Sequence, residues 1–447
     1  MNNLPSGRLR IALLAMHTDP LGRLGGEVSG GMNVYVRETA RVLPSLGAHV
    51  DIFTRAADAD SPALIELAPG ARFIRIPAGP RRPADKNLQA RFTGDFASGI
   101  QDFAGLHGDE YDLISSHYWL SAVAGKQLAL EWKAPLVHRF HTIAAQKNRA
   151  LSGENGLESE ERVREEARIA KGADALVASS AAEADLLTGV LGAEKSKVHI
   201  VPCGVDTERF KPLPRAEARA ALGLNAEERI LLSVGRIEPV KGLERLVPVL
   251  SSLRAMQPTL KTTIIHVGGE VWDSNRGGGG GGCGPEDFSS PIQRDEVHRV
   301  LNIAEEAGVA EDFRFTGAKP QEELRLFYSA ADALSIPSRY ETFSLVALEA
   351  AACGLPAVAF GVGGLSSAIE PEKSGFIVPD GDIEAFSEAA LRLIATPGVR
   401  AKLGDRARKR AESFSWSLVA SKEFDVWKSL LQSRRRHQKY MLESVNV

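Results

Sequence analysis

Short apolar runs alternate with longer helical patterns along most of this chain. Most of the runs are unbroken, as expected for parallel strands that helices cover on both faces. The first series comprises 10–16, 49–55, 73–78, 112–117, 135–140, 175–180 and 198–202, and the second comprises 230–235, 262–269, 313–317, 333–338, 356–360 and 375–379. Helical patterns between them include 31–46, 119–132, 241–254 and 382–395. The alternation predicts an α/β protein with two doubly wound, Rossmann-like sheets.

The segment "CGVDTERFKPLPR" separates the two series and has the proline and charge content of a linker. The chain has 447 residues, more than one hydrophobic core usually supports. We therefore predict an N-terminal domain at 1–203 and a C-terminal domain at 204–414. A final helix at about 415–447 places its apolar residues near one face, and we expect it to pack back onto the N-terminal domain.

The composition of the chain argues against several classes of protein. With 44% hydrophobic residues, 25% charged residues and a net charge of -3, the chain has no general attraction to nucleic acid or anionic membranes. It has no apolar stretch of about 18 residues that could span a bilayer, and the first apolar run lacks a signal-peptide cleavage site. Three cysteines without a CxxC pair argue against a disulfide framework or a zinc site. We expect a cytoplasmic location.

Two glycine-rich stretches need separate interpretation. Gly30 and Gly31 open a helical pattern, where backbone N–H groups could approach a phosphate; the alternative is a simple tight turn. The spacing is not GxGxxG, which disfavours a dinucleotide-binding dehydrogenase. The low-complexity segment 277–284, "GGGGGGCG", cannot form a packed core and is predicted to be a flexible loop.

Two cations follow the first strand of the second series, in "SVGRIEPVKG". Arg236 and Lys241 can therefore lie at the carboxyl edge of the sheet, where α/β proteins bind ligands. An arginine fork and a lysine point charge suit a diphosphate. The alternative is ordinary surface charge beside Glu238.

Two acids stand eight positions apart in "ETFSLVALEA", Glu341 before a helical pattern and Glu349 inside it. The backbone N–H groups at the start of that helix would be available to an anion; they belong to Phe343, Ser344 and Leu345. An unpaired carboxylate is too costly to bury at Glu349, so hydrogen bonds to ligand hydroxyls are a natural explanation. The alternative is that both acids only form hydrogen bonds within the protein.

These motifs, in this order, resemble those of the retaining nucleotide-sugar glycosyltransferases, which have the two-domain GT-B fold. The family includes sucrose-phosphate synthases, phosphatidylinositol mannosyltransferases and D-inositol-3-phosphate glycosyltransferases. The resemblance runs over nearly the whole chain and is greatest to the last group, which starts mycothiol synthesis. The stretches that carry it are 30–36, 116–121, 141–148 and 341–350. It implies two Rossmann-like domains that face each other across a cleft.

The resemblance implies roles on the donor side. Glu341 matches the acid that contacts the transferred sugar, and Glu349 matches the acid that holds the ribose hydroxyls. Arg236 and Lys241 match the diphosphate-binding pair, and Gly31 matches the glycine that faces the donor phosphates.

A further donor-side residue, His141, matches a histidine beside the donor sugar. The chain departs from the family at Ser344, where glycine is usual, although a serine hydroxyl can itself bond to an oxygen. The resemblance implies no bound metal and no other cofactor, because the two cations and helix dipoles neutralise the leaving diphosphate. The "DAD" at 58–60 is given no metal role.

On the acceptor side the resemblance implies a phosphate pocket formed by Lys86, Tyr118, Thr142 and Arg162. Asn33 matches a residue that contacts the inositol ring. Two cations and two hydroxyls suit a phosphate dianion. Each cation alone could equally be surface charge, and Arg164 is an alternative to Arg162 in this charge-dense stretch.

The predicted function is transfer of a hexosyl unit, N-acetylglucosamine or glucose, from a UDP-sugar to a phosphorylated acceptor such as inositol phosphate. The alternative within the family is transfer of glucose to fructose 6-phosphate. A two-domain NAD-dependent dehydrogenase would need a glycine fingerprint that the chain lacks. An inactive sugar-nucleotide-binding module is suggested only by Ser344. The expected partners are the two small substrates, and a homodimer is compatible with the resemblance because related enzymes are often dimers.

Overall fold

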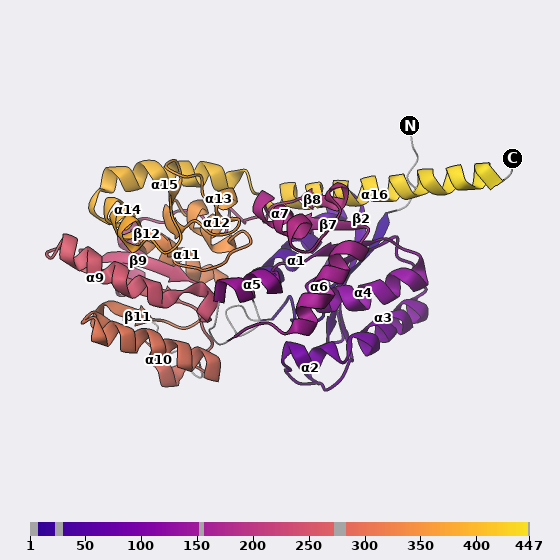
Figure 1. The fold of residues 1–447 in the computed structure, drawn as a ribbon, viewed down its shortest axis with the longest axis horizontal. Coiled ribbons are helices and arrows are strands. Elements are labelled where there is room, and N and C mark those ends of the chain that lie inside the picture. Colours follow the sequence, from indigo (N-terminus) through magenta and orange to yellow (C-terminus); the bar gives the residue numbers. More distant parts are fainter. Residues whose placement is uncertain (1–7, 23–29, 152–155, 272–282, 446–447) are drawn as a thin grey trace.

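The computed structural model describes residues 8–22, 30–151, 156–271 and 283–445. The glycine-rich segment 277–284 falls mostly outside these ranges. Figure 1 shows two α/β domains side by side, with the last helix, α16 (Trp416–Val445), lying along the N-terminal one. The two-domain α/β architecture predicted from the apolar runs is confirmed.

The N-terminal sheet has the strand order β3-β4-β2-β1-β5-β6-β7-β8. All its neighbouring pairs are parallel except β3 with β4. The strands are β1 (Leu9–Leu14), β2 (Ala48–Arg55), β3 (Leu64–Ala68), β4 (Ala71–Ile76), β5 (Leu113–His117), β6 (Leu136–Arg139), β7 (Ala175–Ala178) and β8 (Val198–Ile200). The helices are α1 (Gly31–Val42), α2 (Lys86–Ala90), α3 (Thr93–His107), α4 (Trp119–Trp132), α5 (Ala144–Leu151), α6 (Glu160–Gly172) and α7 (Ala181–Gly189).

The C-terminal sheet is wholly parallel, in the order β11-β10-β9-β12-β13-β14. Its strands are β9 (Arg229–Val234), β10 (Thr262–Val267), β11 (Phe313–Phe315), β12 (Ala333–Ile336), β13 (Ala357–Phe360) and β14 (Gly375–Val378). The helices are α8 (Arg215–Ala221), α9 (Leu246–Met256), α10 (Pro291–Glu306), α11 (Gln321–Ala330), α12 (Leu345–Ala352), α13 (Leu365–Ala368), α14 (Ile383–Ala395) and α15 (Pro397–Glu412). In both sheets the strands are largely buried, which explains their unbroken apolar runs.

Two predicted elements differ from the structure. The pattern at 31–46 is an α-helix only to Val42 and then a 3₁₀ turn that contains Pro44, which cannot continue the α-helical hydrogen bonds. The pattern at 241–254 becomes helical only at Leu246, because Gly242 has a φ of 63° between two 3₁₀ turns.

The chain crosses between the domains twice, and the two crossings lie side by side. Val205 N donates to Phe414 O at 2.8 Å, and Val205 forms a parallel bridge with Ser415. A Cβ atom on Gly204 would lie 2.7 Å from the Trp416 ring, so glycine permits this close passage. The domain boundary placed after residue 203 lies at this double crossing and stays a prediction.

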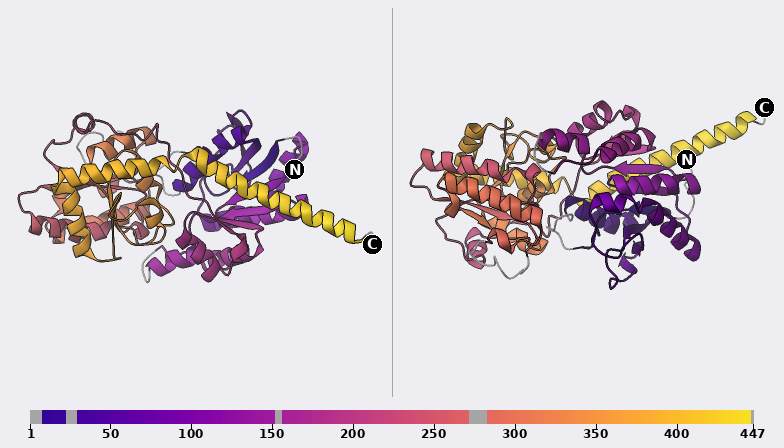
Figure 2. Two further views of the ribbon diagram at one scale, coloured as in Figure 1. Left: turned by 90° about the horizontal axis from the view of Figure 1, so that it is seen from above. Right: turned by 60° about the horizontal axis from the view of Figure 1, so that its bottom comes forward.

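The helix α16 lies along the N-terminal domain (Figure 2), and its apolar residues pack into the core of that domain. Trp416, Val419 and Trp427 belong to the same hydrophobic cluster as the core residues of β1 and α1. Tyr35 on α1 also donates a hydrogen bond to Glu423 Oε2 at 2.7 Å. The last helix therefore ties the C-terminal end of the chain to the domain where the chain began.

Within the described ranges, no helix is long and apolar enough to cross a membrane. The same part of the chain contains no group of three or more His, Cys, Asp or Glu side chains that could hold a metal ion. The expectation of catalysis without a metal stays a prediction.

Candidate active site

The glycine pair of the N-terminal domain lies against the C-terminal domain. Gly31 is the first residue of α1, and Gly30 precedes it. A Cβ atom on Gly30 would lie 3.6 Å from Arg236 Nε, and one on Gly31 would lie 3.2 Å from Leu345 Cδ1. Because Leu345 begins α12, the N-termini of α1 and α12 meet between the domains beside an arginine. This combination suits an anionic ligand.

The two cations after β9 each pair with a carboxylate of their own domain. Arg236 Nη2 lies 2.8 Å from Glu238 Oε1. Lys241 Nζ donates to Glu341 Oε1 at 2.6 Å, and Ser338 Oγ donates to the same oxygen at 2.9 Å. Because β9 and β12 are neighbours in the sheet, the loops that follow them bring Lys241 and Glu341 together. Two motifs about a hundred residues apart thus share one contact.

The loop that contains Glu341 also joins the two domains. Thr342 Oγ1 donates to His141 O at 3.0 Å, and Ser180 Oγ donates to Thr342 O at 3.1 Å. A Cβ atom on Gly363 would lie 1.8 Å from Glu341 O, so the loop packs directly on glycine backbone. These contacts fix the first acid of the motif beside the N-terminal domain.

Ser344 is strained at the start of α12. It has a φ of 89°, the left-handed region that glycine adopts without cost, which explains the usual glycine of the family. Its Oγ accepts a hydrogen bond from Ala347 N at 3.3 Å, so the side chain caps the helix in return. The neighbouring Phe343 side chain is buried in the core against Phe414, which leaves only its backbone to face a ligand.

Glu349, the second acid of the motif, is buried one turn into α12. Tyr328 Oη donates to its Oε2 at 2.8 Å, and Gln321 Nε2 donates to its Oε1 at 3.3 Å. Burial raises the pKa of Glu349 to about 7, although the two hydrogen bonds oppose that rise. Both acids of the motif thus have partners within the protein, as the alternative interpretation required, and a ligand hydroxyl would join or replace those partners.

His141 lies at the carboxyl end of β6 and has a φ of 62°. Its Nε2 is 2.8 Å from His117 Nδ1, and its ring packs edge-on against Tyr35. Burial, followed by the neighbouring His117, lowers the pKa of His141 well below its ordinary value. His141 is therefore a neutral imidazole near pH 7, with His117 setting which nitrogen carries the proton. Sequence reasoning did not identify His117, although the "SHYW" motif contains it.

The four residues predicted for the acceptor phosphate form one cluster around the buried Arg162. Arg162 Nη1 donates to Tyr118 Oη at 2.9 Å, and Nη2 donates to Thr142 Oγ1 at 2.9 Å. Lys86 belongs to the same cluster because Glu158 contacts both Lys86 and Arg162. Arg164, the alternative, is largely exposed and pairs only with Glu160 among the contacts of the described residues. The structure therefore brings Lys86, Tyr118, Thr142 and Arg162 together.

The charged partners of this cluster were not predicted. Glu158 Oε2 lies 3.0 Å from Arg162 Nη1, and Glu166 Oε1 accepts from Arg162 Nε at 2.7 Å. Lys147 Nζ donates to Glu158 Oε1 at 3.1 Å and to Glu238 Oε2 at 3.4 Å. Since Glu238 also contacts the arginine of the donor side, a continuous row of alternating charges connects the two domains.

Asn33 and His17 complete the N-terminal side. Asn33 is buried in the first turn of α1, and its Nδ2 donates to Asp19 O at 2.7 Å and to Thr18 Oγ1 at 3.1 Å. The His17 ring packs on Tyr118 at 3.9 Å between centroids. Burial and the nearby cations of both domains lower the pKa of His17 to about 3. Those cations are Arg162, Lys86 and Arg236.

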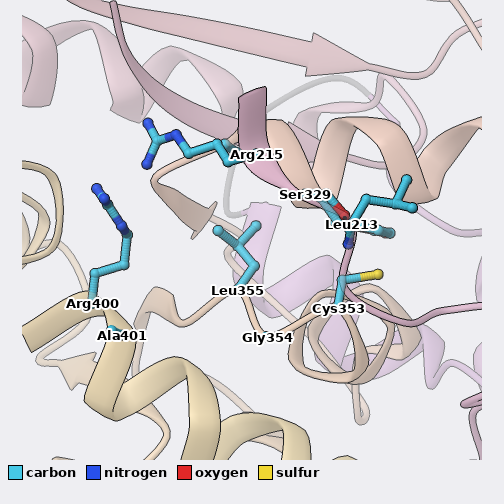
Figure 3. A pocket seen from close by; sticks show the side chains of 10 residues that line it. Leu213, Arg215, Ser329, Cys353, Gly354, Leu355, Arg400 and Ala401 are labelled. Atoms are coloured by element: carbon cyan, nitrogen blue, oxygen red, sulfur yellow. Dashed lines mark hydrogen bonds between the residues drawn. The ribbon is translucent and has the colours of Figure 1, made fainter. Parts of the chain in front are cut away.

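A separate pocket of about 180 Å³ lies at the C-terminal end of α12 (Figure 3). Arg215 and Arg400 face each other at one end of it, and both pair with the buried Asp332. Two of its lining residues contact Glu349 of the candidate site: Tyr328 Oη donates to its carboxyl, and Cys353 N donates to its backbone oxygen. The pocket is lined by Leu213, Arg215, Tyr328, Ser329, Ala331, Cys353, Gly354, Leu355, Arg400 and Ala401. None of the predicted site residues lines it.

Comparisons with known proteins find relatives over nearly the whole chain. Residues 214–410 match the family described as glycosyl transferases group 1, and residues 30–204 match the glycosyl transferase 4-like domain. The chain is 38% identical over 427 residues to a D-inositol 3-phosphate glycosyltransferase of Saccharomonospora viridis, covering 95% of each chain. It is 36% identical to that of Streptomyces coelicolor, covering 96% of this chain and 93% of the relative.

Among solved structures, a sucrose-phosphate synthase from Thermosynechococcus elongatus has a TM-score of 0.83 at 32% identity and covers 95% of this chain and 100% of its own. The Anabaena protein HepE in complex with UDP and glucose has a TM-score of 0.72 at 19% identity, with 94% and 100% covered, and supports the fold alone.

Proposed function

The chain belongs to the group 1 glycosyltransferases of GT-B fold, and from that membership we propose that it transfers a hexosyl unit from a UDP-sugar to inositol phosphate. The observation that supports this acceptor most is the cluster in which the buried Arg162 contacts Tyr118 and Thr142 and shares Glu158 with Lys86. Cations and hydroxyls that meet at one point suit a phosphate dianion. D-inositol 3-phosphate glycosyltransferases of similar length support the same assignment.

On the donor side the diphosphate would lie between the two helix N-termini. Arg236 and Lys241 would neutralise its charge, with Gly31 and the amides at the start of α12 as further donors. Lys241 is held by Glu341, so the same contact would place the acid beside the sugar attached to the diphosphate. Glu349 would accept hydrogen bonds from the ribose hydroxyls.

The proposed reaction retains the configuration of the anomeric carbon. The bond from that carbon to the diphosphate oxygen breaks, and the acceptor hydroxyl bonds to the carbon from the same face. Its proton passes to the departing diphosphate, so no carboxylate nucleophile and no metal are required. His141, as a neutral imidazole, can donate a hydrogen bond to the sugar without adding charge.

A second acceptor is supported by one observation. The structure with 32% identity and a TM-score of 0.83 is a sucrose-phosphate synthase. A phosphate pocket of this composition would also bind fructose 6-phosphate, because the phosphate is common to both acceptors.

The experiment is a grid of UDP release. UDP-N-acetylglucosamine and UDP-glucose are each combined with inositol phosphate, free inositol and fructose 6-phosphate. We expect inositol phosphate to be the best acceptor and free inositol a far poorer one, with the α-anomer retained in the product by NMR. Arg162→Ala should lose the preference for phosphate, whereas the control Arg164→Ala should keep it, because Arg164 is exposed on the same helix. Equal discrimination by both variants would contradict the acceptor assignment.

A further inference from the structure

Glu158 is the anion at the centre of the acceptor cluster, and its position is fixed by its own backbone. Asn148 Oδ1 accepts from Glu158 N at 2.7 Å, and Asn148 Nδ2 donates to Glu158 O at 3.0 Å. The two bonds clamp the segment before α6 to α5. The Glu158 side chain is only 2% exposed, so the carboxylate is held from behind and cannot move far into solvent.

Three cations from three helices converge on that carboxylate. Lys86 Nζ donates to Oε1 at 2.6 Å, Lys147 Nζ donates to the same oxygen at 3.1 Å, and Arg162 Nη1 lies 3.0 Å from Oε2. Burial alone would raise the pKa of Glu158, but Arg162, Lys147 and Lys86 outweigh it and lower the pKa to about 2. Glu158 is therefore ionised wherever the protein is folded near neutral pH.

The exposure of these charged side chains shows which of them a ligand that arrives from solvent would contact. The Lys86 side chain is 37% exposed and that of Lys147 is 16% exposed, against 2% for Glu158. The carboxylate thus forms the floor, and the ammonium groups stand above it. Each ammonium has three N–H donors, so bonding to the floor leaves donor capacity for an anion that arrives from the solvent side.

We propose that Glu158 is a positioning residue of the acceptor pocket, whose carboxylate gathers Lys86, Lys147 and Arg162 into one cationic surface that selects a phosphorylated acceptor. This inference rests on the proposed function, and it explains why the enzyme would prefer a phosphorylated acceptor. Without the floor carboxylate, Lys86 would lose both oxygens that fix its ammonium group. A lysine has a long flexible stem, so its charge would no longer be held at one point.

The same carboxylate opposes the lowering of the Lys86 pKa. Burial lowers the pKa of Lys86, Glu158 opposes this, and Lys147 and Arg162 add to the lowering. The cations of this cluster also act on Tyr118, Glu166, Glu238 and His17, and His17 is neutral near pH 7. Removing the Glu158 charge would leave the lysine facing only cations, so the pKa of Lys86 would fall further. As the pH is raised, acceptor binding by a variant without this charge should therefore begin to weaken at a lower pH than acceptor binding by the wild type.

The test compares Glu158→Gln with Glu160→Gln, a control two residues away whose side chain is 92% exposed. Glu158→Gln should raise the KM for inositol phosphate about tenfold, because ordered contacts to charge are lost. Its KM for the donor should change much less than its KM for the acceptor, because Glu158 reaches the donor cation Arg236 indirectly, through Lys147 and Glu238. The alkaline limb of kcat/KM for the acceptor should move to lower pH, and Glu158→Asp, which keeps the charge, should restore the limb. Glu160→Gln should match the wild type.

A binding arm separates this inference from the proposed function. Inorganic phosphate is titrated into the protein in saturating UDP, which occupies the donor cations and reports that each variant is folded. We expect phosphate to bind Glu158→Gln about tenfold more weakly than the wild type. Equal or tighter phosphate binding by Glu158→Gln would overturn the positioning role, and so would an unmoved pH limb. A wild type that ignores inositol phosphate but shows the expected phosphate difference would overturn only the proposed acceptor.

Discussion

Replacement of Glu349 by glutamine should change the stability of the protein in a manner that depends on pH. Glu349 is 6% exposed on α12, and its carboxyl has Tyr328 and Gln321 as hydrogen-bond partners. Glutamine has nearly the same shape but cannot ionise. It can accept from only one of the two donors without rearrangement, a cost that is the same at every pH. The change therefore isolates the free energy of burying the charge.

The magnitude follows from the pKa of Glu349, which burial raises from 4.5 to about 7 in the folded protein. The folded state binds the proton of Glu349 more tightly than the unfolded state does. The protonated acid therefore stabilises the fold fully below the pKa of the unfolded state, and this stabilisation is lost as pH rises through the pKa of the folded state. A shift of this size corresponds to about 3 kcal/mol. As the pH rises from below 4.5 to above 7, the free energy of unfolding of the wild type should thus fall by about 3 kcal/mol relative to that of Glu349→Gln.

The assay is urea denaturation of both proteins at about pH 5 and about pH 8, followed by circular dichroism. Raising the pH should favour the variant over the wild type, and the difference should grow between the two conditions by most of that free energy. The control is Glu388→Gln, which removes one exposed carboxylate from α14 by the same substitution. If wild type and Glu349→Gln differ by the same free energy at both pH values, the carboxyl does not carry a burial penalty and the reasoning fails.

Three further outcomes test the site. Lys241→Ala should weaken UDP binding by calorimetry, whereas Glu341→Ala should lower turnover more than UDP affinity, because that acid is assigned to the sugar and not to the nucleotide; the reverse order would contradict the donor assignment. Activity should persist in excess EDTA, and activity lost in EDTA but restored by magnesium would show a metal requirement. In a double-mutant cycle on acceptor kcat/KM, Lys147→Met and Glu238→Gln should be non-additive, because their contact at 3.4 Å joins the domains; additive effects would mean that the contact does not matter for turnover.

The sequence predicted the fold well wherever strands are buried on both faces. The run at 10–16 corresponds to β1 (Leu9–Leu14), and the run at 333–338 corresponds to β12 (Ala333–Ile336). The strand β3 (Leu64–Ala68) was missed because it is an antiparallel edge strand with partly exposed residues, and its segment has no unbroken apolar run. Periodicity detects strands that are covered, and an exposed edge strand gives it little signal.

The donor cations and acids were accessible to sequence reasoning because ligand groups in α/β proteins follow the carboxyl ends of strands. Arg236 follows β9 and Glu341 follows β12, and both lie where that rule puts them. The contact between Lys241 and Glu341 was not accessible, because strand order decides which loops are neighbours. A motif thus identified the groups, and only the topology of the sheet could pair them.

The counter-ions of the acceptor cluster show a different limit. Glu158 lies in the stretch "LESEERVREEARIA", whose other acids include the exposed Glu160, and composition alone cannot separate a buried acid from an exposed one. Spacing carried the missing signal. Glu158, Arg162 and Glu166 recur at intervals of four: Glu158 lies two residues before α6 begins, Arg162 and Glu166 share one face of the helix, and Arg162 contacts both acids. A buried arginine needs such partners. Once Arg162 is taken to face a ligand, the acids four residues before and after it are therefore the residues that must hold it in place.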